Sequence, residues 1–204
     1  MTRYLDDWPL SSSRFAQFYT NPSMAGACWR VLHDSALIAP DAFYVEPSAG
    51  AGAFYDLMPS ARRFGCDIDP HPFCPVLQAD FLELPLERLS FPGQVVVVGN
   101  PPFGHSRVHS VRTPTGLLGI ASAFFNRCAL FADVIAFVLP AAYSTRSPRS
   151  WSFEFVPGFD LVSEHRLPAS SFWGPDASLA DPDGGFSYPC VFQVWRRIPL
   201  LSCS

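Results

Sequence analysis

The sequence predicts a single α/β domain built on a mostly parallel sheet, and three observations support this fold class. The run Val95–Gly99 is apolar throughout, which is typical of a parallel strand buried on both faces. A second apolar run covers Val134–Pro140, and the helical spacing of apolar residues over Ser122–Phe131 suits a crossover between these strands. With 204 residues, 49% hydrophobic and 16% charged, the chain can bury one substantial core. We therefore expect one domain over residues 1–204.

The first expected strand leads into a glycine-bearing turn. Residues Phe43–Phe54 (FYVEPSAGAGAF) are typical of a strand, a turn and the start of a helix. Gly50 and Gly52 would let the backbone approach a ligand closely, and the free N–H groups of the following helix would point to the same place. Tyr55 stands where the dinucleotide fingerprint has its third glycine, so a pyrophosphate is not the favoured ligand.

The next two expected strands end in carboxylates. These strands lie within Arg62–Pro70 (RRFGCDIDP) and Val76–Phe81 (VLQADF). Asp67 could accept hydrogen bonds from the hydroxyls of a ribose, Ile68 could pack on an adenine, and Asp80 could accept from the adenine amino group. Each acid taken alone could instead be a surface charge or a helix cap.

The strongest motif ends the strand Val95–Gly99. Pro101 and Pro102 lack N–H donors, so the segment offers carbonyl oxygens and the side-chain oxygen of Asn100, and Phe103 adds a flat apolar face. Acceptors beside an aromatic face suit a planar ring with an exocyclic amino group, such as adenine. The alternative is a simple strand-ending turn. A ligand site is favoured because all these motifs come where strands end, and open α/β sheets bind ligands there.

Together the motifs resemble the class I S-adenosylmethionine-dependent methyltransferases, and within them the amino-methylating group of the N6-adenine type with an Asn-Pro-Pro-Phe motif. The resemblance covers nearly all of the chain. It implies a Rossmann-like, mostly parallel seven-stranded sheet with an antiparallel C-terminal strand, helices on both faces, and S-adenosyl-L-methionine as cofactor. Residues Gln17–Pro22 look like the segment that crosses the methionine end of the cofactor in DNA adenine methyltransferases.

The same resemblance implies the residues of the site. The implied catalytic residues are Asn100, Pro101, Pro102 and Phe103. The implied cofactor-binding residues are Tyr19, Thr20, Asn21, Glu46, Ser48, Ala49, Gly50, Gly52, Asp67, Ile68, Asp80, Phe81 and Asn100.

The expected chemistry follows from the poor nucleophilicity of an adenine amino group, whose lone pair is delocalised into the ring. If Asn100 Oδ1 and the Pro101 carbonyl accept its two N–H hydrogens, the nitrogen becomes more pyramidal and its lone pair is freed. Stacking on Phe103 would hold the base in line with the sulfonium methyl, so most of the acceleration would come from positioning and electrostatics. No general base is strictly needed.

The charge of the chain limits how it could bind nucleic acid. The formal net charge is −4, and all 14 basic residues are Arg. A local positive patch is therefore required. Two loops without acids, at residues 104–113 and 143–149, follow predicted parallel strands and should share the rim of the site. The candidate substrate contacts in these loops are His105, Arg107, Arg112, Arg146 and Arg149. Ordinary solvated loops are the alternative, and we expect the longer loop to be disordered until substrate arrives.

The rest of the chain completes the expected architecture. Asp160–Leu167 and Cys190–Arg196 are predicted to form a final hairpin. The six cysteines show no Cys-x-x-Cys pair and no His at ligand spacing, so we expect reduced thiols and no metal. The N-terminus has no features of a signal or transit peptide, and no stretch suits a membrane span, which favours the cytoplasm.

The size of the chain leaves no room for a large target-recognition region. RNA or an exposed single-stranded site is therefore favoured over duplex DNA, and a partner protein could supply recognition. Three alternatives stay open: a protein glutamine methyltransferase, a guanine-N2 methyltransferase, and a catalytically silent subunit that keeps the fold.

Overall fold

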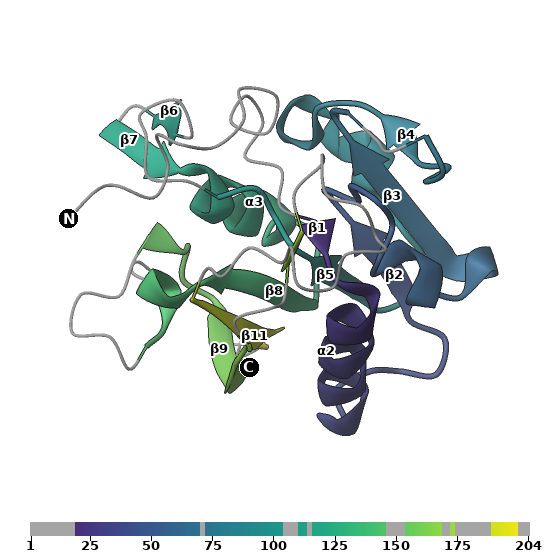
Figure 1. Cartoon of the computed structure of the whole chain (residues 1–204). Helices are drawn as coiled ribbons and strands as arrows, with labels where there is room; N and C mark the ends of the chain where they lie inside the picture. The colour runs from purple at the N-terminus through teal and green to yellow at the C-terminus, as the bar shows by residue number, and fades with distance from the viewer. Residues whose placement is uncertain are drawn as a thin grey trace, which may run out of the picture.

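The computed structural model describes residues 19–69, 72–103, 110–113, 116–145, 154–168, 172–173 and 189–199. Its main feature is one seven-stranded sheet, which Figure 1 shows running from β4 at the upper right to β9 at the lower left. In spatial order the strands are β4 (Leu77–Gln78), β3 (Arg63–Asp67), β2 (Phe43–Glu46), β5 (Val95–Gly99), β8 (Val134–Pro140), β11 (Cys190–Arg197) and β9 (Phe159–Arg166).

The sheet is mostly parallel, with one antiparallel C-terminal strand. Strand β5 pairs in parallel with β2 and with β8, whereas β11 is antiparallel to both β8 and β9. All residues of β5 and β8 are buried, as expected for strands covered on both faces. The predicted α/β fold, the two apolar strands and the final hairpin of β9 and β11 are therefore confirmed.

The order of the strands creates a switch point between β2 and β5. From β2 the chain steps outward to β3 and β4, and then returns to the other side of β2 as β5. The loops that leave β2 and β5 consequently diverge and leave a crevice between them, where ligands bind in open α/β sheets. The glycine turn and the Asn-Pro-Pro-Phe segment are these two loops.

The α-helices of the described part are α2 (Pro22–Asp34) and α3 (Ile120–Cys128). Helix α2 begins with Pro22 after the cap Asn21, whose Oδ1 accepts from the Ser23 N–H at 3.0 Å. Helix α3 is the expected crossover between β5 and β8, and it ends three residues earlier than predicted. The Arg197 guanidinium binds the carbonyls of Ala129 and Ala132 just beyond its end.

One expectation about the helices is wrong. The glycine turn leads into a short 3₁₀ turn, η1 (Tyr55–Leu57), where an α-helix was expected. The reason is Pro59, because the residue before a proline avoids the helical region, and Met58 is extended with ψ 143°. Other connections are also 3₁₀ turns, namely η2 (Ser60–Arg62), η3 (Phe81–Glu83), η4 (Leu86–Leu89) and η6 (Ala141–Tyr143). Within the described ranges, the sheet therefore carries fewer α-helices than expected.

Two short antiparallel ribbons accompany the sheet. In one, β6 (Ser110–Thr113) pairs with β7 (Gly116–Gly119), so the end of the loop that we expected to be disordered is a strand. The Gly and Ser content suggested flexibility, but the β-branched residues Val111 and Thr113 favour an extended chain. In the other, β1 (Tyr19–Thr20) pairs with β10 (Phe172–Trp173). No helix within the described ranges is long and apolar enough to cross a membrane.

Candidate functional site

The glycine turn after β2 has the backbone conformation that small residues permit. Gly50 has φ +50° and Gly52 has φ +86°, both in the left-handed region that favours glycine. A Cβ on Gly50 would lie 2.8 Å from the ring of Tyr19, so that ring packs directly on the turn. The N-terminal segment that was expected to cross the cofactor therefore lies against the predicted cofactor loop.

A small cavity of about 20 Å³ lies between the turn and the end of β5. It has room for about one water molecule. The residues around it are Tyr19, Thr20, Glu46, Ser48, Ala49, Gly50, Ala51, Ala53, Phe54 and Asn100. Seven of these were predicted as cofactor contacts from the sequence. Ala51, Ala53 and Phe54 were missed, and the signal for them was their position directly beside the two glycines.

Ser48 joins the two loops of the crevice. Its hydroxyl donates to the backbone carbonyl of Asn100 over 3.2 Å. The bond uses the backbone carbonyl of Asn100 and does not involve its side-chain amide. Asn100 Oδ1 is a buried atom, and Pro101 and Phe103 are buried residues.

Glu46 is the most buried acid of the site, with 2% of its surface exposed. It fits against β5 because Gly99 has no side chain, since a Cβ there would lie 3.3 Å from Glu46 Cγ. Burial raises the pKa of Glu46 well above its usual range, although a hydrogen bond from the backbone N–H of Tyr55 lowers it. Within the described residues, Oε2 of this carboxyl has no hydrogen-bond partner.

Asp67 lies at the end of β3, as predicted, and it also stabilises the glycine turn. Its two oxygens accept from the N–H groups of Gly50 at 2.7 Å and Asp69 at 2.9 Å. Burial raises the pKa of Asp67, and these N–H donors lower it. Each carboxylate oxygen can accept a second hydrogen bond, so a ribose hydroxyl remains an acceptable partner. Ile68 beside it is 46% exposed and offers an apolar surface.

The two residues predicted to contact the cofactor adenine, Asp80 and Phe81, mainly stabilise the fold. Asp80 is exposed and caps η3, because its Oδ1 accepts from the Leu82 N–H at 2.9 Å. Phe81 is 2% exposed and stacks on Phe124 with ring centroids 5.4 Å apart, so it belongs to the core. Neither residue reaches the cavity beside Gly50, and the same is true of the helix cap Asn21.

The ring of Phe103 is 4% exposed, so the surface expected to stack on a base is covered. A base could reach it only after neighbouring groups move. Of the predicted substrate contacts, Arg112 lies in β6, where the structure describes the backbone. His105, Arg107, Arg146 and Arg149 lie outside the described residues.

Tyr55 occupies the position of the third fingerprint glycine, and its ring packs against β3. That glycine normally permits close packing between the helix and the strand. Here a glycine of the strand, Gly65 in β3, provides the space instead, because a Cβ on Gly65 would lie 2.9 Å from the Tyr55 ring. The guanidinium of Arg63 covers the same ring at 4.1 Å and donates to the Tyr55 carbonyl at 2.9 Å.

A buried hydrogen-bond network supports the chain after β8, and the sequence did not predict it. Gln193 is fully buried in β11, and its Nε2 donates to the Tyr143 carbonyl at 2.9 Å and to Glu164 at 2.8 Å. Its Oε1 accepts from the Trp195 indole at 3.1 Å. Glu164 also accepts from the Ser144 hydroxyl at 2.7 Å. The available signal was one amide in an otherwise apolar strand, VFQVW.

The cysteines of the described part are buried free thiols. Burial raises the pKa of both Cys66 and Cys74 to about 12, so the thiol form is favoured near neutral pH. Cys203 lies outside the described residues.

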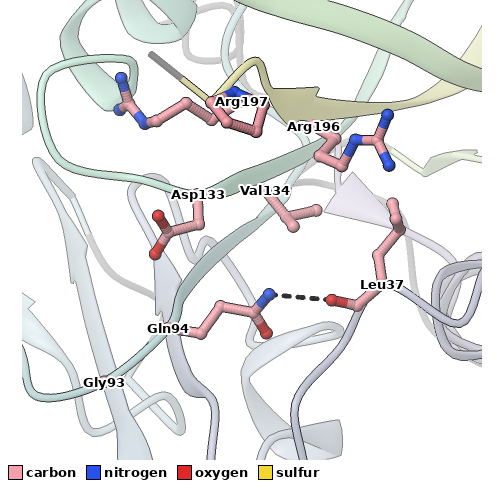
Figure 2. A pocket seen from close by; sticks show the side chains of 8 residues that line it. Leu37, Gly93, Gln94, Asp133, Val134, Arg196 and Arg197 are labelled. Atoms are coloured by element: carbon pink, nitrogen blue, oxygen red, sulfur yellow. Dashed lines mark hydrogen bonds between the residues drawn. The ribbon is translucent and has the colours of Figure 1, made fainter. Parts of the chain in front are cut away.

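A larger hollow of about 550 Å³ lies at the opposite edge of the sheet, where β5 and β8 begin (Figure 2). Its main polar side chains have structural roles. Gln94 donates to the Leu37 carbonyl at 2.8 Å, and Asp133 accepts from the Val95 N–H at 2.8 Å. The Arg197 guanidinium binds backbone carbonyls after α3. The hollow lies at the opposite end of β5 from the Asn-Pro-Pro-Phe motif, and Gln94, Asp133 and Arg197 stabilise the backbone around it.

The comparisons with known proteins support the fold. No family model matches the chain, and no curated protein matches it. A similar solved structure is the crystal structure of Thermoplasma acidophilum 1320, with a TM-score of 0.55 and 18% sequence identity. The match covers 87% of this chain and 90% of that one. At this identity the similarity shows a shared fold.

Proposed function

We propose that this protein is an S-adenosylmethionine-dependent methyltransferase that acts on the exocyclic amino group of adenine in a nucleic acid. One observation carries the proposal. The glycine turn and the Asn-Pro-Pro-Phe segment meet at the switch point of the sheet, where the Ser48–Asn100 hydrogen bond joins them beside one cavity. Ligand sites of open α/β sheets lie at such points.

The residues present fit the proposed cofactor. Gly50 lets the turn come close to a ligand, Asp67 has acceptor capacity for a ribose, and Glu46 brings a buried carboxyl to the cavity. The cofactor would supply an electrophilic methyl group on its sulfonium. Ile68 and the turn would hold its adenosine part, and Tyr19 would cover its methionine end.

The chain itself would activate the acceptor by orienting it. Asn100 Oδ1 and the Pro101 carbonyl accept the two hydrogens of the target amino group, which localises the nitrogen lone pair. Neither proline can donate a competing N–H, so the motif presents acceptors to an amine. The Ser48 bond fixes the backbone of Asn100, and fixed acceptors act mainly through positioning and electrostatics.

The net charge of the chain and the access to the target base favour one kind of nucleic acid as the substrate. With a net charge of −4, binding depends on local Arg residues, and the acid-free segments after β5 and β8 supply them. A target adenine must be unpaired before its amino group can reach Asn100 Oδ1 and the Pro101 carbonyl, and unpairing costs least in RNA or single-stranded DNA, which favours these over duplex DNA. A protein partner that recognises the target, and a cytoplasmic location, belong to the same proposal.

The proposal is tested by incubating the purified chain with methyl-labelled S-adenosylmethionine and separate pools of RNA, single-stranded DNA, duplex DNA and protein. The Asn100→Ala variant is the matched control. Digestion should yield N6-methyladenosine or its deoxy form from one single-stranded pool, and none with the variant. Label in N2-methylguanosine or methylglutamine would replace adenine by another acceptor. Cofactor binding with no transfer to any pool, even with cell extract added, would favour a silent subunit.

A further inference from the structure

The chain just after β8 is held by a carboxyl group from β9 and an amide from β11. Glu164 Oε1 accepts from the Ser144 hydroxyl at 2.7 Å, and its Oε2 accepts from the Thr145 N–H at 3.1 Å. Gln193 donates to the same Oε2 at 2.8 Å and to the Tyr143 carbonyl at 2.9 Å. We refer to Tyr143, Ser144 and Thr145 as the β8 exit.

A second group of hydrogen bonds holds the side chain of Tyr143. Its hydroxyl lies 2.9 Å from Ser122 Oγ in the first turn of α3, and Ser122 donates to the carboxyl of Glu154. The Tyr143 hydroxyl is therefore the donor in its bond to Ser122. A Cβ on Gly119 would lie 2.9 Å from the phenol oxygen, so the residue before α3 leaves the space for it. The β8 exit is thus connected to α3, β9 and β11.

The fold does not need these polar contacts for stability alone. Gln193 in the apolar part of β11 and Ser122 in α3 are both fully buried. A buried hydrogen bond adds little net stability, and replacement of both partners by apolar groups of the same shape can be nearly neutral. What a fully bonded polar network adds is one defined geometry. The network therefore indicates that the position of the β8 exit is important.

The β8 exit lies on the side of β5 that is left for the target. The proposed cofactor contact Gly50 follows β2 and the contact Asp67 ends β3, and both strands lie on one side of β5 (Figure 1). On the other side, β8 is the direct neighbour of β5 and runs parallel to it. Parallel neighbours end at the same edge of a sheet. The β8 exit therefore emerges beside Asn100, on the side away from the cofactor loops.

We propose that Glu164 and Gln193 are positioning residues for the target nucleotide, because they hold the β8 exit as a rigid wall of the target site beside Asn100. This inference rests on the proposed function. Neither residue touches the reacting atoms in this role. The wall decides where the target base stops relative to Asn100 Oδ1, and a misplacement of about 1 Å can lower a rate by about a hundredfold. Loss of the wall should therefore lower the rate of transfer more than the affinity for the nucleic acid.

Two substitutions at Glu164 separate geometry from charge. Glu164→Ala removes the acceptor that holds the β8 exit, and it should lower the single-turnover rate by about tenfold to a hundredfold. Glu164→Gln keeps the hydrogen bonds. Its amide oxygen can accept from Thr145 and Gln193, and its NH2 group can donate to the Ser144 oxygen. The rate of this variant should therefore stay within about threefold of wild type.

Phe91→Leu is the control for a loss of stability. It removes the stacking of Phe91 on Phe43, whose ring centroids are 4.6 Å apart, at the end of the sheet opposite to the β8 exit. This variant should have a lower urea midpoint and the wild-type rate at a temperature where all proteins are folded. Gln193→Leu tests the second positioning residue. Combined with Glu164→Ala, it should lower the rate little further than either change alone, since both act on the same segment.

Each protein is assayed for single-turnover transfer to the nucleic-acid pool that wild type methylates, with cofactor and nucleic acid saturating. Fluorescence anisotropy with S-adenosylhomocysteine bound gives the dissociation constant of the nucleic acid, and calorimetry gives that of the cofactor. Urea denaturation gives the stability. Hydrogen exchange at the Thr145 N–H reports on the wall itself, and it should become faster in Glu164→Ala but not in Glu164→Gln.

The expected result is a lower rate in Glu164→Ala while both dissociation constants change by less than about threefold. An equal loss of rate in Phe91→Leu, or a loss of nucleic-acid affinity as large as the loss of rate, would overturn the positioning role. A Glu164→Gln variant that loses rate while Thr145 stays protected would also overturn it, because Glu164 would then act through its charge. Transfer by wild type with the same rate in Glu164→Ala would overturn this inference alone. No transfer by wild type to any pool would overturn the proposed function as well.

Discussion

The hydroxyl of Ser48 donates a 3.2 Å hydrogen bond to the backbone carbonyl of Asn100. The two residues are 52 positions apart in the chain, and the bond fixes the proposed cofactor loop relative to the proposed catalytic amide. Its contribution should therefore appear in the rate of transfer more than in cofactor affinity.

Ser48→Ala is expected to lower the single-turnover rate about fivefold, which corresponds to one ordinary hydrogen bond. The cofactor dissociation constant from calorimetry should change by less than that. Ser60→Ala, which removes an exposed hydroxyl in η2, is the control and should leave both values unchanged. An equal loss of affinity and rate would mean that the bond shapes the cofactor pocket instead.

Asn100→Ala should abolish detectable transfer and leave cofactor binding largely intact. The amide oxygen is proposed to act on the target nitrogen, and removal of one aligned polar group of this kind typically lowers kcat by about a hundredfold to a thousandfold. Single-turnover transfer with the active pool and calorimetry with S-adenosylhomocysteine measure the two quantities. Undiminished turnover would exclude the proposed role of the amide.

Gly65→Ala should destabilise the protein by about 1–3 kcal/mol, because overpacking of a dense site strains it. The new Cβ would lie 2.7 Å from Val76 Cγ1 and 2.9 Å from the Tyr55 ring. Gly26→Ala is the opposite control, since a Cβ there meets nothing within 4 Å and α2 gains a better helix former. It should stabilise by about 0.5–1 kcal/mol in urea denaturation. A Gly65→Ala variant as stable as wild type would show that Tyr55 can move.

Part of the fold and of the candidate site could be predicted from the sequence alone. The apolar strands β5 and β8 were predicted because burial on both faces leaves continuous apolar runs, and the crossover helix α3 between them was predicted from its helical spacing. The same pattern placed Glu46, Gly50 and Asn100 at strand ends, and the structure brings them around one cavity. Local patterns carry this information because parallel strands share one edge.

What the sequence did not predict depends on contacts between distant segments. Tyr55 was interpreted as a departure from the glycine fingerprint, and only the fold shows that Gly65 provides the space for it. Asp80 has the same chemistry whether it caps η3 or meets a ligand, so residue type could not distinguish the two roles. The Gln193 network could not be predicted because its partners Glu164 and Tyr143 lie far away in the sequence and come close only when the sheet forms.

Gln193→Leu should destabilise the protein by about 2–4 kcal/mol. The substitution keeps the volume but removes the amide that accepts from the Trp195 indole and donates to the Tyr143 carbonyl and to Glu164. Each buried hydrogen bond that is lost without replacement costs about 1–3 kcal/mol. Urea denaturation monitored by tryptophan fluorescence measures the loss. Gln78→Leu, at an exposed amide in β4, is the control and should stay within about 1 kcal/mol of wild type. Equal stability of the two variants would show that the network adds little.

Without cofactor, the stability of the protein should fall as the pH rises above the ordinary carboxyl range. Burial raises the pKa of Glu46, so the unfolded chain loses this proton near about pH 4.3 while the folded chain still holds it. Between the unfolded and folded pKa values the unfolded state binds fewer protons, so its free energy falls relative to the folded state. The slope from one such group approaches about 1.4 kcal/mol per pH unit, and it ends once the pH exceeds the folded pKa.

Glu46→Gln removes this titration, so the curve of its unfolding free energy against pH should be flatter than that of wild type. The difference between the two proteins isolates Glu46 from other groups, including Asp67, whose pKa is also raised, and His33, whose pKa burial lowers. Urea denaturation of both proteins at several pH values, with Asp56→Asn alongside, measures the slopes. The variant should become the more stable protein as the pH rises, because wild type must then ionise a buried carboxyl or unfold. Parallel curves for wild type and Glu46→Gln would mean that Glu46 is already ionised in the folded protein, held by a contact that keeps its charge.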